Sequence, residues 1–434
     1  MGTKVKTKKR RVVSGMRPTG PLHIGHYFGA LQNWIRLQND PSYECFYFVA
    51  DWHALTTDYA NTLGTSIESI EIGIDWLACG LDPDQSTLFV QSAVPEHAEL
   101  HLLLSMVTPL GSLERVPTYK EQLENIKDKD LHTYGFLGYP VLQSADIVIY
   151  SSGASELAVP VGQDQVSHVE LTRELVRKFN FHYGLRFSKK LFGKAGKDAF
   201  GRIMEGSNIV SLTPLKGEFG RLRVNLKREI SERIGQIGYS NFMTNFNVPR
   251  DFICQEPVLL EPATLLTDSP RIPGTDGRKM SKSYGNAITL SETNEEIRKK
   301  TKAMVTDPAR IRRSDVGNPD VCPVYDWHKL FSAEEQGRLE WVRQGCTTAT
   351  IGCIDCKSAM ADNLIKWIEP IREKRLHYQK RRKLVREILE ESSTRARVHA
   401  RATMLKVREA MFGEDRITRH PLRDRLISKP AKGI

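Results

Sequence analysis

Short apolar runs alternate with segments of helical periodicity through residues 12–186, and this alternation is the strongest constraint on the fold. Residues 45–50 (CFYFVA) form a continuous apolar run, as expected of a strand buried on both faces of a parallel sheet. Apolar residues then recur at helical spacing over 67–77, and residues 88–90 (LFV) form a further short run. The pattern predicts an α/β domain whose ligands bind beyond the carboxyl ends of parallel strands.

Chain length and apolar content set the class of protein. The 434 residues, 40% of them apolar, are enough for two or three domains with full cores. No apolar run approaches the roughly 18 residues of a membrane span, and no apolar stretch follows the basic residues 1–11 as in a secretory signal. Seven cysteines without such a signal indicate a reducing compartment. We therefore expect a cytoplasmic protein with no membrane partner.

Positive charge is concentrated in three segments. Residues 1–11 carry a net charge of +6, residues 186–250 carry +8 and residues 371–434 carry +11, whereas the rest of the chain carries −14. Because Lys and Arg make most protein contacts to phosphates, this segregation favours a polyanionic partner such as nucleic acid. Solvated basic faces on helices are the alternative explanation, and charge alone leaves both open.

A first candidate for chemistry is residues 21–26 (PLHIGH), which follow a predicted strand at residues 11–14 and precede a helical pattern. His23 and His26 are thereby placed at a helix N-terminus, where free N–H groups and the helix dipole favour phosphate. Two imidazoles one turn apart can donate hydrogen bonds to a phosphoryl group in transfer. Gly25 lets a nucleotide base lie on the backbone. Taken alone, two such histidines are more often structural.

A second candidate, residues 279–283 (KMSKS), lies more than 250 residues downstream and follows the Gly-rich segment 274–277 (GTDG). Two lysines and two hydroxyls on a mobile loop can follow a triphosphate and neutralise the departing pyrophosphate. In isolation this pentapeptide is compatible with an ordinary surface loop. Its occurrence together with PLHIGH in one chain favours the functional interpretation.

The two elements resemble the HIGH and KMSKS motifs of class I aminoacyl-tRNA synthetases, and the sequence around them is similar to the tryptophanyl-tRNA synthetase family. The resemblance covers residues 12–185 and 251–413. Five further segments carry it: residues 15–20 (GMRPTG), 48–56 (FVADWHALT), 113–115 (LER), 139–146 (YPVLQSAD) and 159–165 (VPVGQDQ). It implies a Rossmann-like parallel-sheet catalytic domain with a C-terminal α-helical anticodon-binding domain.

The chain is divided accordingly into six segments. They are a basic N-terminal arm (1–11), the first part of the catalytic domain (12–185), a basic insertion (186–250), the rest of the catalytic domain with the KMSKS loop (251–293), a helical tRNA-binding domain (294–413) and a basic tail (414–434). The resemblance does not extend to the insertion or the tail, so it assigns neither a role.

By the resemblance, Asp146 accepts the indole N–H of tryptophan, and Tyr139 and Gln165 bind the α-amino group. The physical chemistry agrees for Asp146, because indole offers one donor and no acceptor, so a carboxylate selects it over phenylalanine. Gln143, where many relatives have Met, is a departure beside this site.

The resemblance also implies an ATP site. The catalytic residues are His23, His26, Lys279 and Lys282, which stabilise the transferring phosphates. The other ATP-binding candidates are Arg17, Pro18, Thr19, Gly25, Lys120, Gly162, Gln163, Asp164, Ile272, Met280, Ser281 and Ser283. Mg²⁺ neutralises the phosphates, and no protein nucleophile is needed because positioning and charge stabilisation carry the step.

Four cysteines in the helical region, Cys322, Cys346, Cys353 and Cys356, follow the pattern C-x23-C-x6-C-x2-C. Four thiolates suit tetrahedral zinc or a 4Fe–4S cluster. The spacing resembles the C-x22-C-x6-C-x2-C motif that holds an iron–sulfur cluster in some bacterial tryptophanyl-tRNA synthetases. A 4Fe–4S cluster is therefore the preferred prediction, zinc is the alternative, and free thiols are the third interpretation.

The predicted function is that of a tryptophan–tRNA ligase acting as a homodimer on L-tryptophan, ATP and tRNA(Trp). A tyrosyl-tRNA synthetase is the first alternative, which would need a Tyr/Asp pair around a phenol hydroxyl. The second is a paralogue that binds RNA or senses tryptophan without charging tRNA, and the intact HIGH and KMSKS motifs argue against it.

Overall fold

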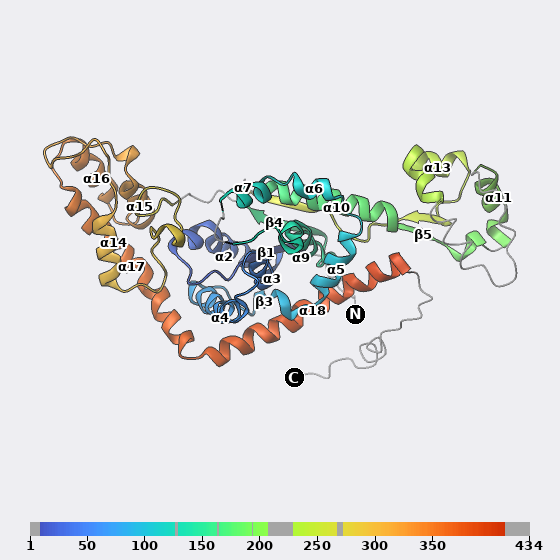
Figure 1. The fold of residues 1–434 in the computed structure, drawn as a ribbon, viewed down its shortest axis with the longest axis horizontal. Helices are drawn as coiled ribbons and strands as arrows, with labels where there is room; N and C mark the ends of the chain where they lie inside the picture. The colour runs from blue at the N-terminus through green and yellow to red at the C-terminus, as the bar shows by residue number, and fades with distance from the viewer. Residues whose placement is uncertain are drawn as a thin grey trace, which may run out of the picture.

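A five-stranded, fully parallel sheet lies at the centre of the part of the chain that the structure, a computed structural model, describes (Figure 1). The described residues are 9–125, 129–162, 165–192, 194–206, 229–266 and 272–412. The strands run in the order β3 (Ser86–Val90), β2 (Tyr43–Val49), β1 (Arg10–Met16), β4 (Glu156–Val161) and β7 (Pro262–Leu266). The predicted α/β fold class is confirmed.

Central strand β1 marks the point where the strand order reverses. Val12 of β1 lies opposite Cys45 of β2 on one side and Ala158 of β4 on the other. In an open parallel sheet, a reversal of this kind leaves a crevice at the carboxyl ends of the two diverging strands. The fold therefore predicts a ligand site at the ends of β1 and β4.

The sheet is buried on both faces, which explains why the run at 45–50 is apolar throughout. Val12 and Tyr47 belong to one hydrophobic cluster, and Val13, Phe46 and Phe89 belong to another on the opposite face. All five side chains are fully buried. Alternate residues of each strand thus enter separate cores, as covering helices on both sides require.

Helices of the catalytic part cover both faces of the sheet (Figure 1). Their bounds are α1 (Ile24–His26), the π-helical turn η1 (Tyr27–Leu31), α2 (Gln32–Gln38), α3 (Asp51–Leu55), α4 (Thr62–Cys79), η2 (Gln91–Ala93), α5 (Glu96–Ser105), α6 (Leu110–Glu114), α7 (Pro117–Asn125), α8 (Tyr134–Leu137), α9 (Tyr139–Val148) and α10 (Val166–Tyr183). α2 and α4 contribute to the first cluster, and α5, α9 and α10 to the second.

The predicted insertion forms a small unit with its own core at one end of the molecule (Figure 1). Two antiparallel strands, β5 (Leu185–Phe187) and β6 (Ile253–Gln255), connect it to the sheet domain. Between them lie η4 (Lys189–Phe192), η5 (Lys194–Gly196), α11 (Lys197–Gly206) and α13 (Tyr239–Asn245). Residues 207–228, which hold five of the thirteen basic residues of the insertion, are outside the described residues.

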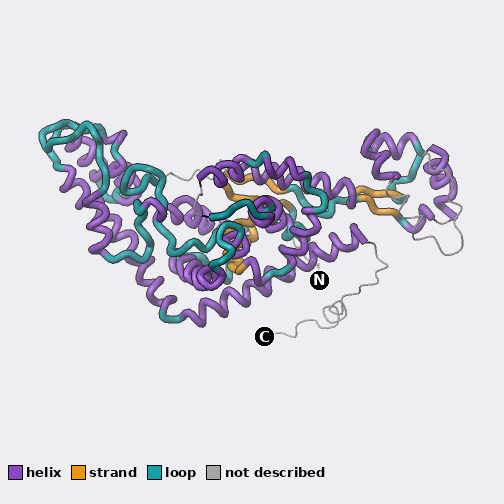
Figure 2. Tube along the Cα trace, viewed as in Figure 1, coloured by secondary structure: helices purple, strands orange, loops and turns teal. Residues whose placement is uncertain are grey.

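The C-terminal part is helical, as predicted. It contains η6 (Lys282–Tyr284), α14 (Asn294–Ala303), η7 (Pro319–Val321), α15 (Pro323–Phe331), α16 (Arg338–Thr347), α17 (Cys353–Gln379) and α18 (Arg382–Phe412). α14–α17 gather at the end opposite the insertion, and α18 runs back along the catalytic part (Figures 1 and 2). Buried residues of α18, Ala396, Ala400, Met404 and Val407, complete the second hydrophobic cluster.

Much of the positive charge on α17 and α18 is neutralised within the chain. The ion pairs are Arg375–Asp75, Arg375–Glu71, Arg382–Glu71, Arg397–Glu96, Arg401–Glu96 and Arg408–Glu99. Their acidic partners lie on α4 and α5 of the catalytic part. The basic segment 371–434 thus binds α17 and α18 to the sheet domain. This role of its charge was not predicted from the sequence.

The two ends of the chain, residues 1–8 and 413–434, lie outside the described residues, so the predicted arm and tail are largely untested. In the part that is described, none of the helices has the length and apolar content needed to cross a membrane.

Candidate active site

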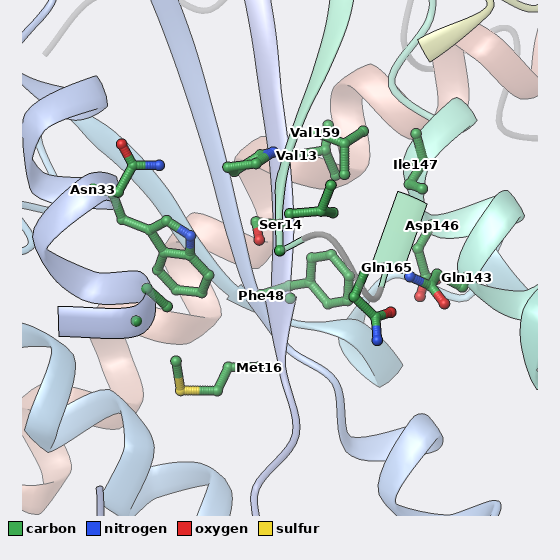
Figure 3. A pocket seen from close by; sticks show the side chains of 17 residues that line it. Val13, Ser14, Met16, Asn33, Phe48, Gln143, Asp146, Ile147, Val159 and Gln165 are labelled. Atoms are coloured by element: carbon green, nitrogen blue, oxygen red, sulfur yellow. The ribbon is translucent and has the colours of Figure 1, made fainter. Parts of the chain in front are cut away.

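Two connected cavities lie at the carboxyl edge of the sheet, where the strand order predicts a ligand site. The first cavity is lined by the ends of β1 and β4 and by η1 and α2. The second is lined by residues of α3, α7, α8 and α9 and of the segment after β1. Five residues line both: Gly15, Phe48, Gln143, Asp146 and Gln165. In Figure 3, Gln143, Asp146 and Gln165 lie together on one side of the first cavity and Asn33 lies opposite.

Asp146 is held by three side chains at the place where the cavities meet. His53 Nε2 lies 2.9 Å from its Oδ2, and His97 Nδ1 lies 2.6 Å from its Oδ1. Gln91 Nε2 donates to both oxygens at 2.8 Å. The carboxyl group is 1% exposed, so each of these hydrogen bonds is shielded from water.

The carboxyl group of Asp146 is ionised despite its burial. Burial alone would raise its pKa, but hydrogen bonds from His53 and His97 and their electrostatic effect lower the pKa to about 2. An ionised carboxylate only accepts hydrogen bonds, so both imidazoles must donate to it. The group therefore has the charge that a single N–H donor of a ligand would recognise.

His97 is fixed on both of its ring nitrogens. Its Nε2 lies 2.8 Å from the hydroxyl of Tyr150, and both side chains are fully buried. Burial raises the pKa of Tyr150 well above its usual value, so the hydroxyl keeps its proton. The ring is thus held rigidly against Asp146 Oδ1.

A second hydrogen-bonded chain holds Gln143 and Tyr139. Gln143 Oε1 lies 2.5 Å from His168 Nδ1, and His168 Nε2 lies 2.6 Å from Thr118 Oγ1. Thr118 Oγ1 in turn lies 2.7 Å from the Tyr139 hydroxyl. Gln143 therefore presents its amide to the cavities in one orientation.

The PLHIGH histidines lie at the start of a helical run, as predicted. His23 precedes α1, the backbone N–H of His23 donates to His26 Nδ1 at 3.2 Å, and the two rings stack with centroids 3.6 Å apart. Burial and the neighbouring Lys282 ammonium lower the pKa of His23 to about 4; burial, His23 and Lys282 lower that of His26 to about 3. At neutral pH both rings are therefore uncharged, and each carries one N–H group that can donate a hydrogen bond.

The KMSKS loop lies directly on the PLHIGH segment. The Lys282 ammonium donates to the backbone carbonyls of Thr19 and Pro21, the latter at 3.1 Å. Met280 is buried, and its sulfur would lie 3.4 Å from a Cβ added to Gly25. A side chain at position 25 would also lie 2.9 Å from His23 Nδ1, so this close approach requires glycine.

The loop owes its shape to Asn286. Its side-chain nitrogen donates to Asp276 Oδ1 at 2.7 Å and to the Lys279 carbonyl at 3.1 Å, and its oxygen accepts from Ser281 N at 2.7 Å. The Lys279 side chain itself is exposed. The indole N–H of Trp327 on α15 also donates to the Pro273 carbonyl just before the loop, at 2.9 Å.

The structure brings together most of the predicted site residues. Arg17, Tyr139 and Gln165 line the second cavity, and Gly162 lines the first. Ile272 packs in the core beside Met280 rather than in the lining, and Lys120 is exposed on α7 and belongs to neither lining in the described structure. Gln163, Asp164 and the side chain of Ser283 lie outside the described residues. No ligand is present, so all these roles stay predictions.

Sequence reasoning missed the three donors that hold Asp146. His53 lies on α3 just after β2, Gln91 follows β3 directly, and His97 is the second residue of α5. Polar side chains just after buried parallel strands converge at one edge of a sheet, and that position was the available signal. Asn33 and Trp34 of α2, which line the first cavity, were also missed.

The four cysteines line one small cavity among α15, α16 and α17. Cys322 is the residue before α15, Cys346 lies in the last turn of α16, and Cys353 and Cys356 lie in the first turn of α17. In the described residues, no three His, Cys, Asp or Glu side chains are grouped so as to hold a metal ion. The cysteines are therefore together in space, as predicted, whereas a bound metal is not shown.

Arg310 makes this cavity suited to an anionic group. The residue is 8% exposed, its Nη1 lies 3.6 Å from Cys346 Sγ, and its Nη2 donates to the Ile351 carbonyl at 2.5 Å. Its Nε is buried without a hydrogen-bond partner in the described structure. A guanidinium and two helix N-termini favour negative charge, as four cluster-bound thiolates would supply. The surroundings of the four thiols therefore favour negative charge, and the iron–sulfur cluster stays a prediction.

Comparison with known proteins identifies the family of the chain. The sequence model of the class I tRNA synthetases (W and Y) matches residues 5–201 and 224–369. The match includes residues 186–201 and 224–250 of the predicted insertion. The family resemblance described above did not extend to these residues. A tryptophan–tRNA ligase of Ralstonia nicotianae is 47% identical over 410 residues, which cover 92% of this chain and 98% of that one. That of Thermotoga maritima is 42% identical over 401 residues, with the same coverage.

Solved structures agree with the sequence comparison. Tryptophanyl-tRNA synthetase from Campylobacter jejuni, complexed with ADP and tryptophan, superposes with a TM-score of 0.67 at 25% identity and covers 92% of this chain and 98% of that one. A tyrosyl-tRNA synthetase from Archaeoglobus fulgidus shares the fold with a TM-score of 0.52 at 18% identity.

Proposed function

Because the chain belongs to the class I tRNA synthetases for tryptophan and tyrosine, we propose that its two cavities activate L-tryptophan with ATP as a tryptophan–tRNA ligase. A carboxylate oxygen of tryptophan attacks the α-phosphorus of ATP, and the bond to the β-phosphate breaks with its electron pair leaving on pyrophosphate. The terminal adenosine hydroxyl of tRNA(Trp) then attacks the carbonyl carbon, and AMP leaves.

Asp146 is the observation that carries the choice of tryptophan. It is a buried, ionised carboxylate at the meeting point of the cavities, and it accepts the indole N–H. Phenylalanine offers no donor, so it cannot form this buried hydrogen bond with the carboxylate. Tyr139 and Gln165, which line the same cavity, hold the α-amino group.

The other predicted residues act on ATP. His23 and His26 donate N–H groups to the α-phosphate, and Lys282 moves from its backbone carbonyls to the departing pyrophosphate. Lys279, exposed on the same loop, supplies a second positive charge. Mg²⁺ neutralises the phosphates when bound.

Pyrophosphate exchange tests this function most directly. The purified protein is assayed with ATP and, in parallel, L-tryptophan, L-tyrosine and L-phenylalanine, and only tryptophan should support exchange. Exchange with tyrosine instead would identify a tyrosyl enzyme. Exchange with tryptophan without transfer to tRNA(Trp) would identify a paralogue that does not charge tRNA.

A homodimer is supported by apolar residues exposed on the catalytic part. Leu102 and Met106, four residues apart on and just after α5, are 53% and 67% exposed, and Leu110 at the start of α6 is 60% exposed. Such a group of exposed apolar side chains is typical of a protein interface. Light scattering should give twice the chain mass of 49.3 kDa, and Met106→Glu with Leu110→Glu should halve it. Leu384→Glu, at a half-exposed leucine on α18, is the control.

The four-cysteine cavity holds a 4Fe–4S cluster. Cys322, Cys346, Cys353 and Cys356 are its ligands, and Arg310 balances part of its negative charge. The cluster lies among the helices remote from the sheet, so it supports the fold of α15–α17 and takes no part in activation. Zinc is the alternative occupant of the same four thiolates.

A further inference from the structure

Every acceptor position of Asp146 is occupied by a protein donor. Oδ1 accepts from His97 and Gln91, and Oδ2 accepts from Gln91 and His53, at distances of 2.6–2.9 Å. A carboxylate offers about four lone-pair positions, and four N–H contacts fill them. The indole N–H of tryptophan can reach this carboxylate as a full partner only if one protein donor leaves it.

Gln91 and His97 are not able to leave. Both are fully buried, and neither lines the first or second cavity in the described structure. His97 is also held on its other ring nitrogen by Tyr150 at 2.8 Å and lies among the rings of Phe48 and Phe89. Displacing His97 would break these additional contacts, and displacing Gln91 would require a fully buried side chain to move.

His53 differs from the other two donors in its access to the cavity. Its side chain lines the second cavity and is 12% exposed. Among the described residues, its ring has one hydrogen bond, the one to Asp146 Oδ2. It lies on α3, a helix of five residues that follows β2. A rotation of its side chain therefore breaks one hydrogen bond and leads toward the cavity rather than into the core.

We propose that His53 occupies, in the free enzyme, the position on Asp146 Oδ2 that the indole N–H takes when tryptophan binds. His53 and tryptophan exchange on one acceptor, so Asp146 is saturated with donors in both states. The inference rests on the proposed role of Asp146 as the indole acceptor. It assigns a new role to His53, that of a specificity-determining residue which is released by the correct substrate.

The exchange explains how a buried carboxylate tolerates an empty site. Without His53, Oδ2 would lose a buried hydrogen bond whenever no substrate is present. With it, a ligand must bring its own donor, because a ring without N–H displaces His53 and leaves one acceptor position of Oδ2 unpaired, although Gln91 still donates to that oxygen. Discrimination of about 10- to 100-fold against such a ring follows from one unpaired buried acceptor.

Proton NMR of ¹⁵N-histidine-labelled full-length protein tests the exchange. Imidazole N–H protons bound to a carboxylate resonate at low field, and His53 and His97 should give two such signals in the free protein. His53→Phe and His97→Gln assign them by loss of one signal each. Saturating L-tryptophan should remove or shift the His53 signal and leave the His97 signal unchanged. Both signals unchanged with tryptophan bound would overturn the proposal.

Affinity measurements separate this proposal from the role of Asp146. His53→Phe keeps a ring in the cavity but removes the competing donor, so its Kd for tryptophan should stay within about threefold of wild type or tighten. A tenfold weaker affinity for tryptophan would mean that His53 stabilises the site also when tryptophan is bound, and it would overturn the exchange. The analogue 3-benzothienylalanine has sulfur in place of the N–H. If the wild type binds this analogue as tightly as tryptophan, the assignment of Asp146 fails. If the wild type binds the analogue more weakly than tryptophan, but tryptophan leaves the His53 signal unchanged, only the exchange fails.

Discussion

Arg375 Nε lies 2.6 Å from Asp75 Oδ1 and joins α17 to α4 across 300 residues of sequence. Asp75 is fully buried, and its other oxygen accepts from the backbone N–H of Leu22 at 2.9 Å, one residue before His23. Glu71 pairs with the same guanidinium at 2.6 Å. A single buried carboxylate thus connects the helical part to the segment that carries His23 and His26.

Removing this carboxylate should be costly. Asp75→Ala leaves the buried Arg375 with Glu71 as its one carboxylate partner among the described residues, and we expect a loss of about 3 kcal/mol in the free energy of unfolding. Glu261→Gln is the control, because it breaks an exposed pair with Arg177 and should cost less than about 1 kcal/mol. Guanidinium unfolding curves measure both. Equal effects would show that burial does not set the strength of the Asp75 pair.

Asp146→Asn should reduce kcat/KM for tryptophan in pyrophosphate exchange by at least about 100-fold and leave the KM for ATP unchanged. The amide keeps one acceptor oxygen and turns an NH₂ group toward donors that now have no acceptor. Asp40→Asn, at an exposed carboxylate near β2, is the matched control. A wild-type kcat/KM in the Asp146 variant would remove the basis for assigning the indole to this residue.

Lys282→Ala should lower kcat for adenylate formation by at least about 100-fold, with tryptophan affinity within about twofold of wild type. The ammonium rests on backbone carbonyls until charge develops on pyrophosphate, so it contributes in the transition state more than in substrate binding. Lys383→Ala, at a lysine 88% exposed on α18, should change neither quantity. Equal losses in rate and affinity would mean that the loop only shapes the cavity.

Folding stability should decrease as the pH falls from 7 to 5. The pKa values of His23 and His26, about 4 and 3, lie below the unfolded value of about 6.5, so only the unfolded chain gains protons in this range. Each such histidine costs up to about 1.4 kcal/mol per pH unit below its unfolded pKa. His26→Asn should flatten the dependence of Tm on pH. If Tm depends on pH equally in the wild type and the variant, titratable groups other than His26 cause the pH dependence.

Protein purified without oxygen should be brown and contain about four irons per chain. Cys353→Ser should reduce tRNA charging more than pyrophosphate exchange, because the cysteine cavity lies among α15–α17 and not at the sheet. Cys254→Ser, on β6 of the insertion, is the control and should leave the iron content unchanged. One zinc and no iron would replace the cluster with a structural zinc site.

The sequence predicted the parts of the molecule that local pattern determines. The strands around residues 45–50 and 88–90 and the position of His23 before a helix are set by periodicity and flanking residues, and all are present. The donors around Asp146 come from segments 49–93 residues away, so no local pattern connects them. The pairing of Arg375 with Asp75 escaped prediction for the same reason.

The return of α18 across the sheet has a consequence for synthesis on the ribosome. Ala396, Ala400 and Met404 close a core whose other members, such as Val13 and Phe89, are made some 300 to 380 residues earlier. Until α18 emerges, the part of this apolar face that α5, α9 and α10 leave open has no cover, and a nascent chain in this condition is prone to aggregation. The catalytic unit therefore completes its folding only near the end of translation, and a messenger truncated before residue 382 yields a chain that depends on chaperones.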